Sequence, residues 1–547
     1  MLKTRNPFED VDEKKLCSEE FARKEDGQDE LRKLRDEFIV PTKADLKNQK
    51  YGPAQLRGNV ESERTGDSKD EEDAIYLCGN SLGLQPRRTR EYINRYLDTW
   101  ASKGVYGHFK PLEGGHAPWL HIDDAIKEQT AKIVGALPSE VVVMETLTAN
   151  LHLLMASFYK PTKDRYKIII EGKAFPSDHV VCRPLPTRAP QPPPSALITI
   201  SPPSPSDPYL SAEHILSVIS QHAANTALVL LPGIQFYSGQ FLDINLITRH
   251  CHALGITVGW DLAHAVGNVP LQLHDWNIDF AAWCNYKYMN GGPGVIGGLF
   301  VHETHGKVEE APQSAESETT PAAKNTANPS QELKPEDTIE EGKSLTYRPR
   351  LSGWWGSSKS TRFAMSNIFV PIPGASGFQL SNPSALDITS VTASLDVFAL
   401  TSMAALREKS IRLTAYLEAR LLKYPYPYKS SHPSNHKDSE QEHEQEKESE
   451  KDIPYSIITP SNPAERGAQL SVLLRPGMLD DVMQILEEEG VVVDERRPDV
   501  IRVAPVPLYN SYLDVHRFVG VFQEACWRVG GEGKGLGKAE GGEKGNV

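Results

Sequence analysis

Short apolar runs alternate with helical patterns through the middle of the chain. Runs typical of buried strands lie at 141–144, 167–170, 227–231, 257–260 and 280–284. Apolar residues at helical spacing occur over 89–100, over 122–135, from 147 onward and over 244–254. Strands that alternate with helices form parallel sheets with helical crossovers. The pattern therefore predicts an α/β fold built on a mostly parallel sheet.

The pattern changes toward the C-terminus. Strands near 454–458, 467–474 and 490–494, with a helix over 479–489, are typical of a small α+β domain. A long helix around 385–423 is predicted to lead the chain into it. At the other end of the chain, helical spacing of Leu31, Leu34 and Phe38 predicts a helix that packs on the main body.

Polar tracts separate these patterns and indicate domain boundaries. The tracts 306–345 and 427–452 are too polar to bury a core and are predicted to be disordered, and the Pro- and Ser-rich stretch 185–208 is predicted to be a surface excursion. We expect an N-terminal helical and polar extension (1–73), a large ligand-binding α/β domain (74–305), the acidic insertion (306–345), the rest of the large domain with a linking helix (346–400), a small α+β domain (401–529) and a disordered tail (530–547).

Composition and charge narrow the possible functions. The 547 residues are 39% hydrophobic, enough for a sizeable core, and carry a formal net charge of −14. An acidic chain is a poor partner for nucleic acid, whose phosphates need a basic face. No apolar run reaches the ~20 residues that span a bilayer, and the N-terminus lacks the apolar core of a signal peptide. We expect a soluble, cytoplasmic enzyme that binds neither nucleic acid nor membranes.

The six cysteines form no ligand pattern. There is no CxxC pair and no His–Cys ligand spacing among them, which argues against a zinc site and against a disulfide framework. We therefore expect reduced, buried thiols and no bound metal. The cysteines are Cys17, Cys78, Cys182, Cys251, Cys284 and Cys526.

Candidate chemistry is concentrated in the run 259–300. Asp261 follows a predicted strand, so its carboxylate should project from the strand's carboxyl end into a ligand crevice. Lys287 lies 26 residues beyond Asp261, and a glycine-rich stretch follows it. A carboxylate can keep a pyridine nitrogen protonated, and a lysine amine can form an imine with an aldehyde. These are the two groups that a pyridoxal phosphate enzyme requires, and His264 would support the acid or the ring.

Each of these residues has a simpler explanation when it is taken alone. Asp261 is then more simply a buried helix cap, and Lys287 a surface lysine. The combination of a strand, an Asp-x-x-His, a second strand with its lysine and a GGPG run is much rarer. Other site types lack their motifs, since the chain has no GxGxxG for a dinucleotide, no GxxxxGK[ST] for a nucleotide and no GxSxG for a serine hydrolase. We therefore predict a pyridoxal phosphate site.

Loops upstream offer further groups at strand ends. An aromatic ring, a hydroxyl and a carboxylate follow a predicted strand in the segment 175–178. Threonines at 146–148 start a helix whose N–H groups suit a phosphate, although simple N-capping explains them equally well. The turn at 79–82 and the imidazole of His108 are more simply explained as a helix cap and as a packed surface histidine.

Several motifs together resemble the kynureninase family. They are YLCGNSLGLQP, VYGH, TLTANLH, FPSD, WDLAHAVGN, DFAAWCNYKYMNGGPG, GWWG and IRVAPVPLYNS, in this order from about residue 74 to 515. The resemblance implies a fold-type I, class V aminotransferase-like enzyme that uses pyridoxal 5'-phosphate. It also implies hydrolytic cleavage of L-kynurenine or 3-hydroxy-L-kynurenine to alanine and an anthranilate, in tryptophan catabolism and NAD biosynthesis.

The resemblance assigns roles around the cofactor. Lys287 would be the Schiff-base lysine and proton shuttle, Asp261 would pair with the pyridinium, and Tyr286 would act beside them at the phosphate end. Phe175 would stack on the ring. The remaining cofactor-binding positions implied by the family are Leu147, Thr148, Pro176, Ser177, Asp178, His264, Trp354 and Asn382.

The resemblance also assigns the substrate site. His108 and Asn382 would face the aryl ketone end of the substrate, and Arg502 would clamp its α-carboxylate, for which a guanidinium fork is well suited. Trp354 and Asn382 would close the site across the subunit boundary of a homodimer. Pro232 stands where related enzymes commonly have a serine, and proline offers neither hydroxyl nor N–H, so we do not carry that contact over.

Two other functions are alternatives to a kynureninase-like activity. A cysteine desulfurase or an aminotransferase would use the same cofactor, but a desulfurase needs a cysteine on a mobile loop at the site. A scaffold protein could keep the fold without the cofactor, and the presence of Asp261, Lys287 and Arg502 argues against this. The preference between kynurenine and its 3-hydroxy form does not follow from the sequence.

Overall fold

The computed structural model describes the chain in eight stretches. Two compact units make up the chain: unit 1 contains Met1–Arg87, Tyr237–Phe241 and Ala404–Val547, and unit 2 contains Arg88–Phe236 and Leu242–Met403. The predicted disordered insertions and tail lie almost wholly outside the described residues. Those residues are 6–47, 72–111, 117–182, 196–204, 207–310, 345–365, 368–423 and 454–531.

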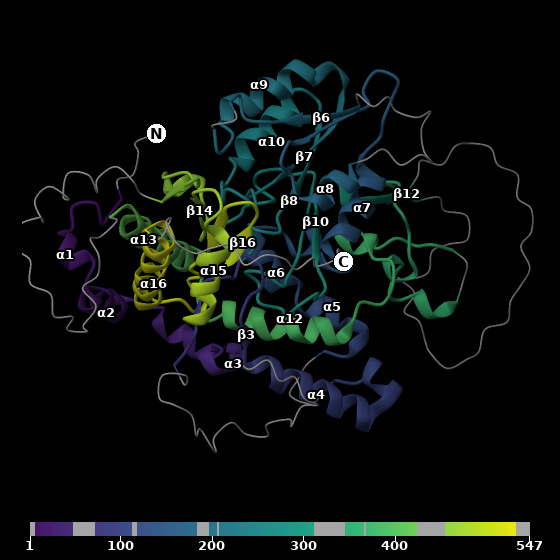
Figure 1. The fold of residues 1–547 in the computed structure, drawn as a ribbon. Coiled ribbons are helices and arrows are strands. Elements are labelled where there is room, and N and C mark those ends of the chain that lie inside the picture. Colours follow the sequence, from purple (N-terminus) through teal and green to yellow (C-terminus); the bar gives the residue numbers. More distant parts are fainter. Residues whose placement is uncertain are drawn as a thin grey trace, which may run out of the picture. The chain divides into compact units, whose positions relative to one another are not determined.

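Unit 2 is built around a seven-stranded sheet with the order β4-β10-β9-β8-β7-β5-β6 (Figure 1). All strands run in one direction except β10, which is antiparallel to both of its neighbours. The mostly parallel α/β fold predicted from the sequence is therefore confirmed. The strands are β4 (Val141–Val143), β5 (Lys167–Glu171), β6 (Leu197–Ile200), β7 (Thr226–Pro232), β8 (Thr257–Asp261), β9 (Phe280–Trp283) and β10 (Gly298–Val301).

Helices cover both faces of this sheet, which explains why its strands are apolar throughout. Alternate residues such as Ile168, Leu230 and Phe280 pack with α7 (Leu147–Phe158) and α8 (Pro176–Val181) in one core cluster. On the other face, Trp260 donates its indole N–H to Thr248 of α10. Figure 1 shows α7 and α8 on one side of the strands and α9 and α10 on the other. The latter helices are α9 (Ala212–His222) and α10 (Ile244–Ala253).

Two long helices predicted from the sequence are each broken in two. The segment 122–135 forms α5 (Ile122–Ala125) and α6 (Lys127–Val134), because Ile126 leaves helical geometry at ψ 0°. The segment 385–423 forms α12 (Ala385–Phe398) and α13 (Met403–Leu422). After α12 the backbone tightens into i→i+3 bonds at Leu400 and Thr401. Thr401 and Ser402 then interrupt the apolar pattern, and such residues favour helix ends.

Other helices of unit 2 lie along the chain between these parts. The helix predicted over 89–100 is confirmed as α4 (Arg87–Lys103). A short helix, α11 (Glu303–Gly306), follows β10 directly. β11 (Val308–Glu310) precedes the acidic insertion, and β12 (Leu345–Tyr347) follows it. The two strands pair with each other in antiparallel fashion. The 3-10 turns η2 (Gly104–His108) and η9 (Trp354–Gly356) contain two of the predicted site residues.

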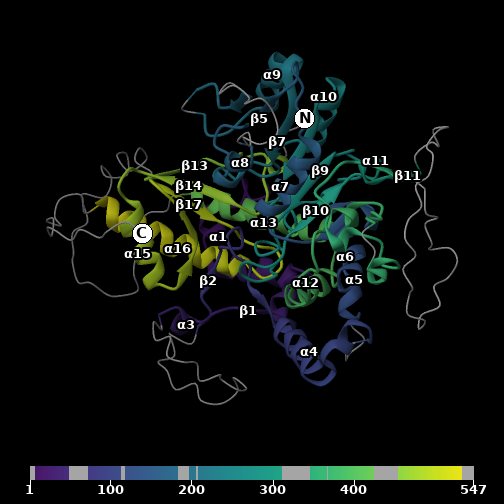
Figure 2. The same cartoon turned by 90° about the vertical axis from the view of Figure 1, so that its right-hand side faces the viewer.

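Unit 1 contains a four-stranded antiparallel sheet with the order β13-β14-β17-β16. A second, parallel pair joins β15 (Val491–Val492) to β2 (Ile75–Tyr76). Figure 2 shows α15 and α16 near these strands. The elements are β13 (Tyr455–Ile457), β14 (Leu470–Leu474), β16 (Asp494–Arg496), β17 (Val500–Val503), α15 (Leu479–Glu488) and α16 (Tyr512–Gly531).

The N-terminal residues share the core of unit 1. Phe8 lies edge-on to Tyr416 of α13 at 5.5 Å between ring centroids, and α2 packs against α16. The helix expected from Leu31 to Phe38 is present as a 3-10 helix over Arg32–Glu37, but Phe38 lies beyond it in a strand that pairs with β3. The N-terminal elements are α1 (Glu13–Leu16), α2 (Glu19–Gln28), η1 (Arg32–Glu37), β1 (Phe38–Ile39), α3 (Lys43–Lys47) and β3 (Gln85–Pro86).

Among the described helices, no single one is both long enough and apolar enough to cross a membrane. The consecutive helices α12 and α13 reach that length and apolarity only when they are taken together.

Candidate active site

The carboxyl ends of the parallel strands bring the predicted site residues to one edge of the sheet. Asp261 is the last residue of β8, and Lys287 follows β9. Residue 171 ends β5, and α7 starts at Leu147 just after β4. Because these strands are parallel, their carboxyl ends lie on the same side, where ligands of open α/β sheets bind. The predicted placement of Asp261 at a strand end is thus confirmed.

Lys287 is buried and contacts the predicted histidine. Its Nζ lies 2.9 Å from Nε2 of His264, and the two residues are only 9% and 6% exposed. The same Nζ lies 6.0 Å from the centroid of the Phe175 ring and 5.7 Å from that of Tyr286. The amine therefore stands in a pocket of two aromatic rings and an imidazole.

Asp261 shares its environment with a second buried carboxyl group. Its Oδ1 accepts the N–H of Ala263 at 2.8 Å, and its side chain hydrogen-bonds to that of Asp178. Burial raises the pKa of Asp178 well above its usual range, and the neighbouring charge of Asp261 raises it further. Burial raises the pKa of Asp261 as well, but the Ala263 N–H and Lys287 oppose this. The pair therefore holds its proton on Asp178, and Asp261 remains the anion.

Ser177 and Pro232 adjoin this carboxyl pair. Ser177 donates its hydroxyl to Oδ1 of Asp178 at 3.2 Å. Pro232 lies opposite Asp261 in the register of β7 and β8, and the next residue, Gly233, donates its N–H to the Asp261 carbonyl at 2.7 Å. The sheet hydrogen bonding beside Asp261 thus continues past the proline.

Glu171 is a member of the site that the sequence analysis did not single out. It is 4% exposed at the end of β5, and the side-chain amide of Gln235 lies 3.3 Å from its Oε2. Burial raises the pKa of Glu171 to about 7, although the Gln235 amide opposes the shift. A glutamate that ends an otherwise apolar run was the signal available in the sequence. The charge of Glu171 also raises the pKa of Asp178, so three carboxyl groups interact at the carboxyl edge of the sheet.

The start of α7 offers unused backbone donors for an anion. Thr146 is the N-cap residue, but its side chain makes no capping hydrogen bond, so the simple capping explanation does not hold for it. A side chain at Gly297 would come within 3.3 Å of the Leu147 nitrogen, so this glycine keeps the space beside that N–H open. Thr148 is exposed in the first turn. Helix N-termini of this kind bind phosphate.

These residues fit pyridoxal phosphate. A buried lysine amine suits the aldehyde, an ionised aspartate suits the ring nitrogen, and the open start of α7 suits the phosphate. Phe175 is 44% exposed and lies edge-on to Phe236 at 5.3 Å, so one ring face is free of that contact and can stack on a ligand. Pro176 follows it as the first residue of α8.

Tyr286 adjoins Lys287 and keeps its proton. Burial raises its pKa, and the neighbouring thiol of Cys284 raises it further. A protonated phenol can donate a hydrogen bond to a phosphate, as predicted. Contact with a phosphate stays a prediction.

Three other predicted residues have no hydrogen bond or ring contact to Lys287 within the part of the chain described. His108 lies edge-on to Trp119 at 5.3 Å, with its Nδ1 3.1 Å from the carbonyl of Val105. Trp354 is 50% exposed and donates its indole N–H to the carbonyl of Arg362 at 3.3 Å. Asn382 is exposed shortly before α12. Their roles at the site stay predictions.

Arg502 belongs to unit 1, where an acidic residue holds it. It is 1% exposed on β17, and its Nη2 and Nε approach the two carboxylate oxygens of Asp494 at 2.7 and 3.2 Å. Ser81 also donates its hydroxyl to Asp494. Asp494 was not predicted as a site residue, since its only signal was its place at the start of a charged run after three valines. The turn at 79–82 and Arg502 are thus parts of one polar network, and Arg502 is held in a defined orientation.

The six cysteines are free thiols, as expected from their scatter. Burial raises the pKa of every one of them, to about 12 for Cys78 and Cys251 and also upward for Cys284 beside Lys287. Thiols with such pKa values carry little thiolate at neutral pH and are poor nucleophiles.

The fold and the site together define an α/β enzyme of the fold-type I class. Residues 76–315 match the class V aminotransferase family, and residues 439–522 match the kynureninase C-terminal domain. Solved structures with the same fold include C-DES with glycine covalently linked to its PLP cofactor (TM-score 0.60, 13% identity, 82% of this chain and 96% of that one). Another is the apo cysteine desulfurase of Thermococcus onnurineus NA1 (TM-score 0.58, 16% identity, 84% and 95%).

Sequence relatives narrow the class to one family. Kynureninase 1 of Phaeosphaeria nodorum is 66% identical over 526 residues, covering 96% of this chain and 95% of the relative. Kynureninase 1 of Aspergillus oryzae is 52% identical, with 96% and 97% covered. Kynureninase of Coccidioides immitis is 51% identical, with 94% and 95% covered. The chain belongs to the kynureninase family.

The proton shared by the carboxyl pair can be tested with two substitutions. Asp178→Asn keeps a donor toward Asp261 without a charge, so it should bind pyridoxal phosphate nearly as tightly as the wild type. Asp178→Ala removes the donor and should weaken binding about 10-fold, since losing the partner of a buried polar group costs about 1–3 kcal/mol. Absorbance titration of the full chain with the cofactor measures both. Equal weakening in the two variants would contradict the assignment of the proton to Asp178.

Glu171 predicts a pH dependence of stability. Its pKa is raised from 4.5 to about 7, so its stabilising contribution is complete below pH 4.5 and is lost as the pH rises through about 7. Glu171→Gln should remove this dependence, which amounts to on the order of 3 kcal/mol across that range. Urea unfolding of unit 2, followed for both proteins at a series of pH values, tests it. Parallel pH profiles for the two proteins would rule the contribution out.

Proposed function

We propose that this chain is a kynureninase that hydrolyses L-kynurenine and 3-hydroxy-L-kynurenine to anthranilate or 3-hydroxyanthranilate and L-alanine. The observation that carries the proposal is the buried Lys287 amine at one sheet edge with the buried Asp261 carboxyl group, in a chain of the kynureninase family. Such a reaction serves tryptophan catabolism and the biosynthesis of NAD, and we propose the cytoplasm as its location.

Lys287, Asp261 and the start of α7 would hold pyridoxal 5'-phosphate. When bound, this cofactor supplies an electron sink for charge released at the α-carbon of an amino acid. Asp261 contributes the fixed anion that keeps the ring nitrogen protonated, because Asp178 carries the proton of the pair. Leu147 and Thr148 would offer their N–H groups to the phosphate, and Tyr286 its hydroxyl.

Proton transfer falls to Lys287. Its Nζ lies 2.9 Å from Nε2 of His264. A neutral Nζ can take the α-proton of the substrate and return it to the product, and the imidazole can hold a proton beside it in the meantime. Burial of both groups limits exchange of that proton with bulk water.

Substrate recognition would use residues that the family resemblance names. The guanidinium of Arg502 would bind the α-carboxylate, and its bidentate pairing with Asp494 fixes the plane in which it does so. His108 and Asn382 would face the aryl ketone. The hydrolytic water would attack the carbonyl carbon next to the aromatic ring, so that the bond between the β and γ carbons breaks.

A cysteine desulfurase is the strongest alternative, because the solved structures of similar fold include such enzymes. That reaction needs a nucleophilic thiolate. Cys284, the thiol next to the lysine loop, is 3% exposed, and burial raises its pKa. The other five thiols have raised pKa values as well. Thiol chemistry therefore has no support in this chain.

Lys287→Ala tests the function. The full-length variant should lose at least about 100-fold in kcat with kynurenine, because a positioned acid–base group contributes roughly 10² to 10⁴. Borohydride reduction of the wild type should fix the cofactor to the peptide that contains Lys287, and mass spectrometry would detect it. Lys307→Ala, an exposed lysine of the same unit, serves as the control. Steady-state kinetics with both substrates would then give their order of preference, and turnover by Lys287→Ala at the wild-type rate would refute the proposal.

We further propose that the chain forms a homodimer through the aromatic surface around Trp354. Phe363 lies edge-on to Trp354 at 5.7 Å and to Phe109 at 6.2 Å between ring centroids, and all three are about half exposed. Met365 and Ile368 nearby are 76% and 64% exposed. Clusters of exposed aromatic and aliphatic side chains of this kind are typical of protein interfaces. A second subunit would cover them, and would place Trp354 and Asn382 at the subunit boundary.

Phe363→Asp should shift the protein toward the monomer. A buried aspartate at an interface costs several kcal/mol, whereas on the exposed surface of one subunit it costs little. Sedimentation equilibrium would measure the mass of the wild type and the variant over a range of concentrations. Leu400→Asp, a change at an exposed position after α12, should leave the mass unchanged. A monomeric wild type, or a dimer indifferent to Phe363→Asp, would refute the interface.

A further inference from the structure

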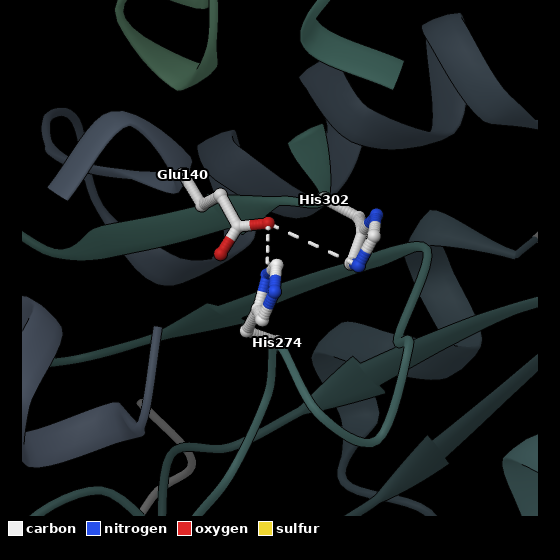
Figure 3. A group of neighbouring side chains, drawn as sticks. All are labelled: Glu140, His274 and His302. Atoms are coloured by element: carbon white, nitrogen blue, oxygen red, sulfur yellow. Dashed lines mark hydrogen bonds and ion pairs between the residues drawn. The ribbon is translucent and has the colours of Figure 1, made fainter. Parts of the chain in front are cut away.

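Three side chains from distant parts of unit 2 converge on one point, as Figure 3 shows. Oε1 of Glu140 lies 2.9 Å from Nδ1 of His274 and 3.9 Å from Nε2 of His302. One ligand atom from each side chain lies within 4.8 Å of the other two. The two imidazole rings are stacked, with centroids 5.2 Å apart and planes 8° from parallel.

The sheet places this cluster away from the candidate active site. Glu140 ends η5 (Pro138–Glu140), immediately before β4, and His302 follows β10 as the N-cap of α11. Because β10 runs opposite to the other strands, its end lies at their amino-terminal edge. Asp261 and Lys287 lie at the carboxyl edge. The cluster is therefore separate from the chemistry proposed above.

Backbone contacts hold the carboxylate in a fixed orientation. Oε2 of Glu140 accepts the N–H of Leu137, and Oε1 accepts the N–H of Glu303, both at 2.9 Å. The Glu140 side chain is fully buried. A carboxylate so deeply buried is costly unless it is hydrogen-bonded and paired with positive charge. The two N–H groups satisfy part of that need, and the histidines face the remaining capacity of Oε1.

Thr304 orients the ring of His302. Nδ1 of His302 accepts the backbone N–H of Thr304 at 3.3 Å and lies 3.0 Å from the Thr304 hydroxyl, so the ring proton is on Nε2 without a metal. Coordination through Nε2 moves the proton to Nδ1, where the Thr304 hydroxyl oxygen can accept it in place of the backbone contact. Histidines that bind metals usually donate their second ring N–H to such a partner. The side chain of His274 is 32% exposed, which gives an ion a path from solvent.

Neighbouring histidines are already engaged elsewhere. His252 and His305 approach the two carboxylate oxygens of Asp279 at 2.9 and 2.7 Å. Those groups satisfy one another. Among the residues that the structure describes, the group Glu140, His274 and His302 is the one whose ligand atoms meet at metal-binding separations.

We propose that Glu140, His274 and His302 bind a divalent first-row metal ion, with Zn²⁺ as the representative. Two imidazoles and one carboxylate are a ligand set that zinc takes in proteins at about 2.0–2.2 Å, with water in the fourth position. On binding, the proton that His274 shares with Glu140 leaves to solvent, and Nδ1 coordinates the ion in its place. The ion offsets the buried charge of Glu140 and joins η5, the segment at 274 and the start of α11.

Sequence spacing gave no sign of this site. Glu140 and His274 are 134 residues apart, far beyond the short separations of zinc motifs. The expectation of no metal rested on those motifs and on cysteine ligands. Pairing within the sheet, between β4 and β10, brings the ligands together instead.

Zinc titration of the full-length holoenzyme tests the proposal. After dialysis against a chelator, calorimetry with Zn²⁺ should show saturable binding of about one ion per chain, which His274→Ala and Glu140→Gln should abolish. Thr304→Ala should weaken binding roughly 10- to 100-fold, as loss of a ligand's orienting partner does. His250→Ala, a histidine of α10 that contacts Ser220, is the matched control and should bind as the wild type does.

A second measurement covers variants that fold poorly. Zn²⁺ should raise the midpoint of thermal unfolding of the wild type and of His250→Ala, but not that of His274→Ala, whose side chain is partly exposed. Absence of saturable Zn²⁺ binding by the wild type would overturn the proposal. Undiminished binding by His274→Ala would overturn it too, and would leave the cluster as an ion pair between a glutamate and a histidine.

Discussion

The burial of charge beneath Lys287 is the constraint on which the site depends. An amine and three carboxyl groups lie in one apolar region of unit 2, where unpaired charges are costly. The chain meets this cost by leaving protons on some of the acids. Asp178 keeps its proton, so that Asp261 alone faces the amine as an anion. The site therefore holds fewer buried charges than it has ionisable groups, because Asp178 is neutral.

Much of unit 2 could be predicted from the sequence, because most of its buried strands are continuous apolar runs, and β5 and β8 end in an acidic residue. Asp261 and Lys287 were found in this way. The antiparallel direction of β10 could not be predicted, since direction depends on where the chain turns after Lys287 and not on the composition of the run 298–301. The break between α12 and α13 was missed because apolar spacing continues on both sides of a short polar interruption.

Residues that act through other residues were the hardest to find. Asp494 is identified only by its partners, Arg502 and Ser81, which lie far from it in the chain. Glu171 has the same difficulty, because its importance comes from burial at a strand end beside Asp178. Local sequence patterns show the spacing of apolar residues in a helix or strand and the residues at its ends. They do not report which side chain from another element will come to lie against it.

The reversed strand β10 has a mechanical consequence. Gly297, at its start, adjoins the first N–H of α7, and His302, at its end, belongs to the cluster with Glu140. A strand advances about 3.4 Å per residue, so a stiff rod of roughly 15–17 Å connects the two. Backbone pairing with β4 on one side and β9 on the other holds it in the sheet. A displacement at one end of β10 is therefore passed to its other end, because no loop lies between the two ends to absorb it. β10 thus couples the two edges of the sheet mechanically.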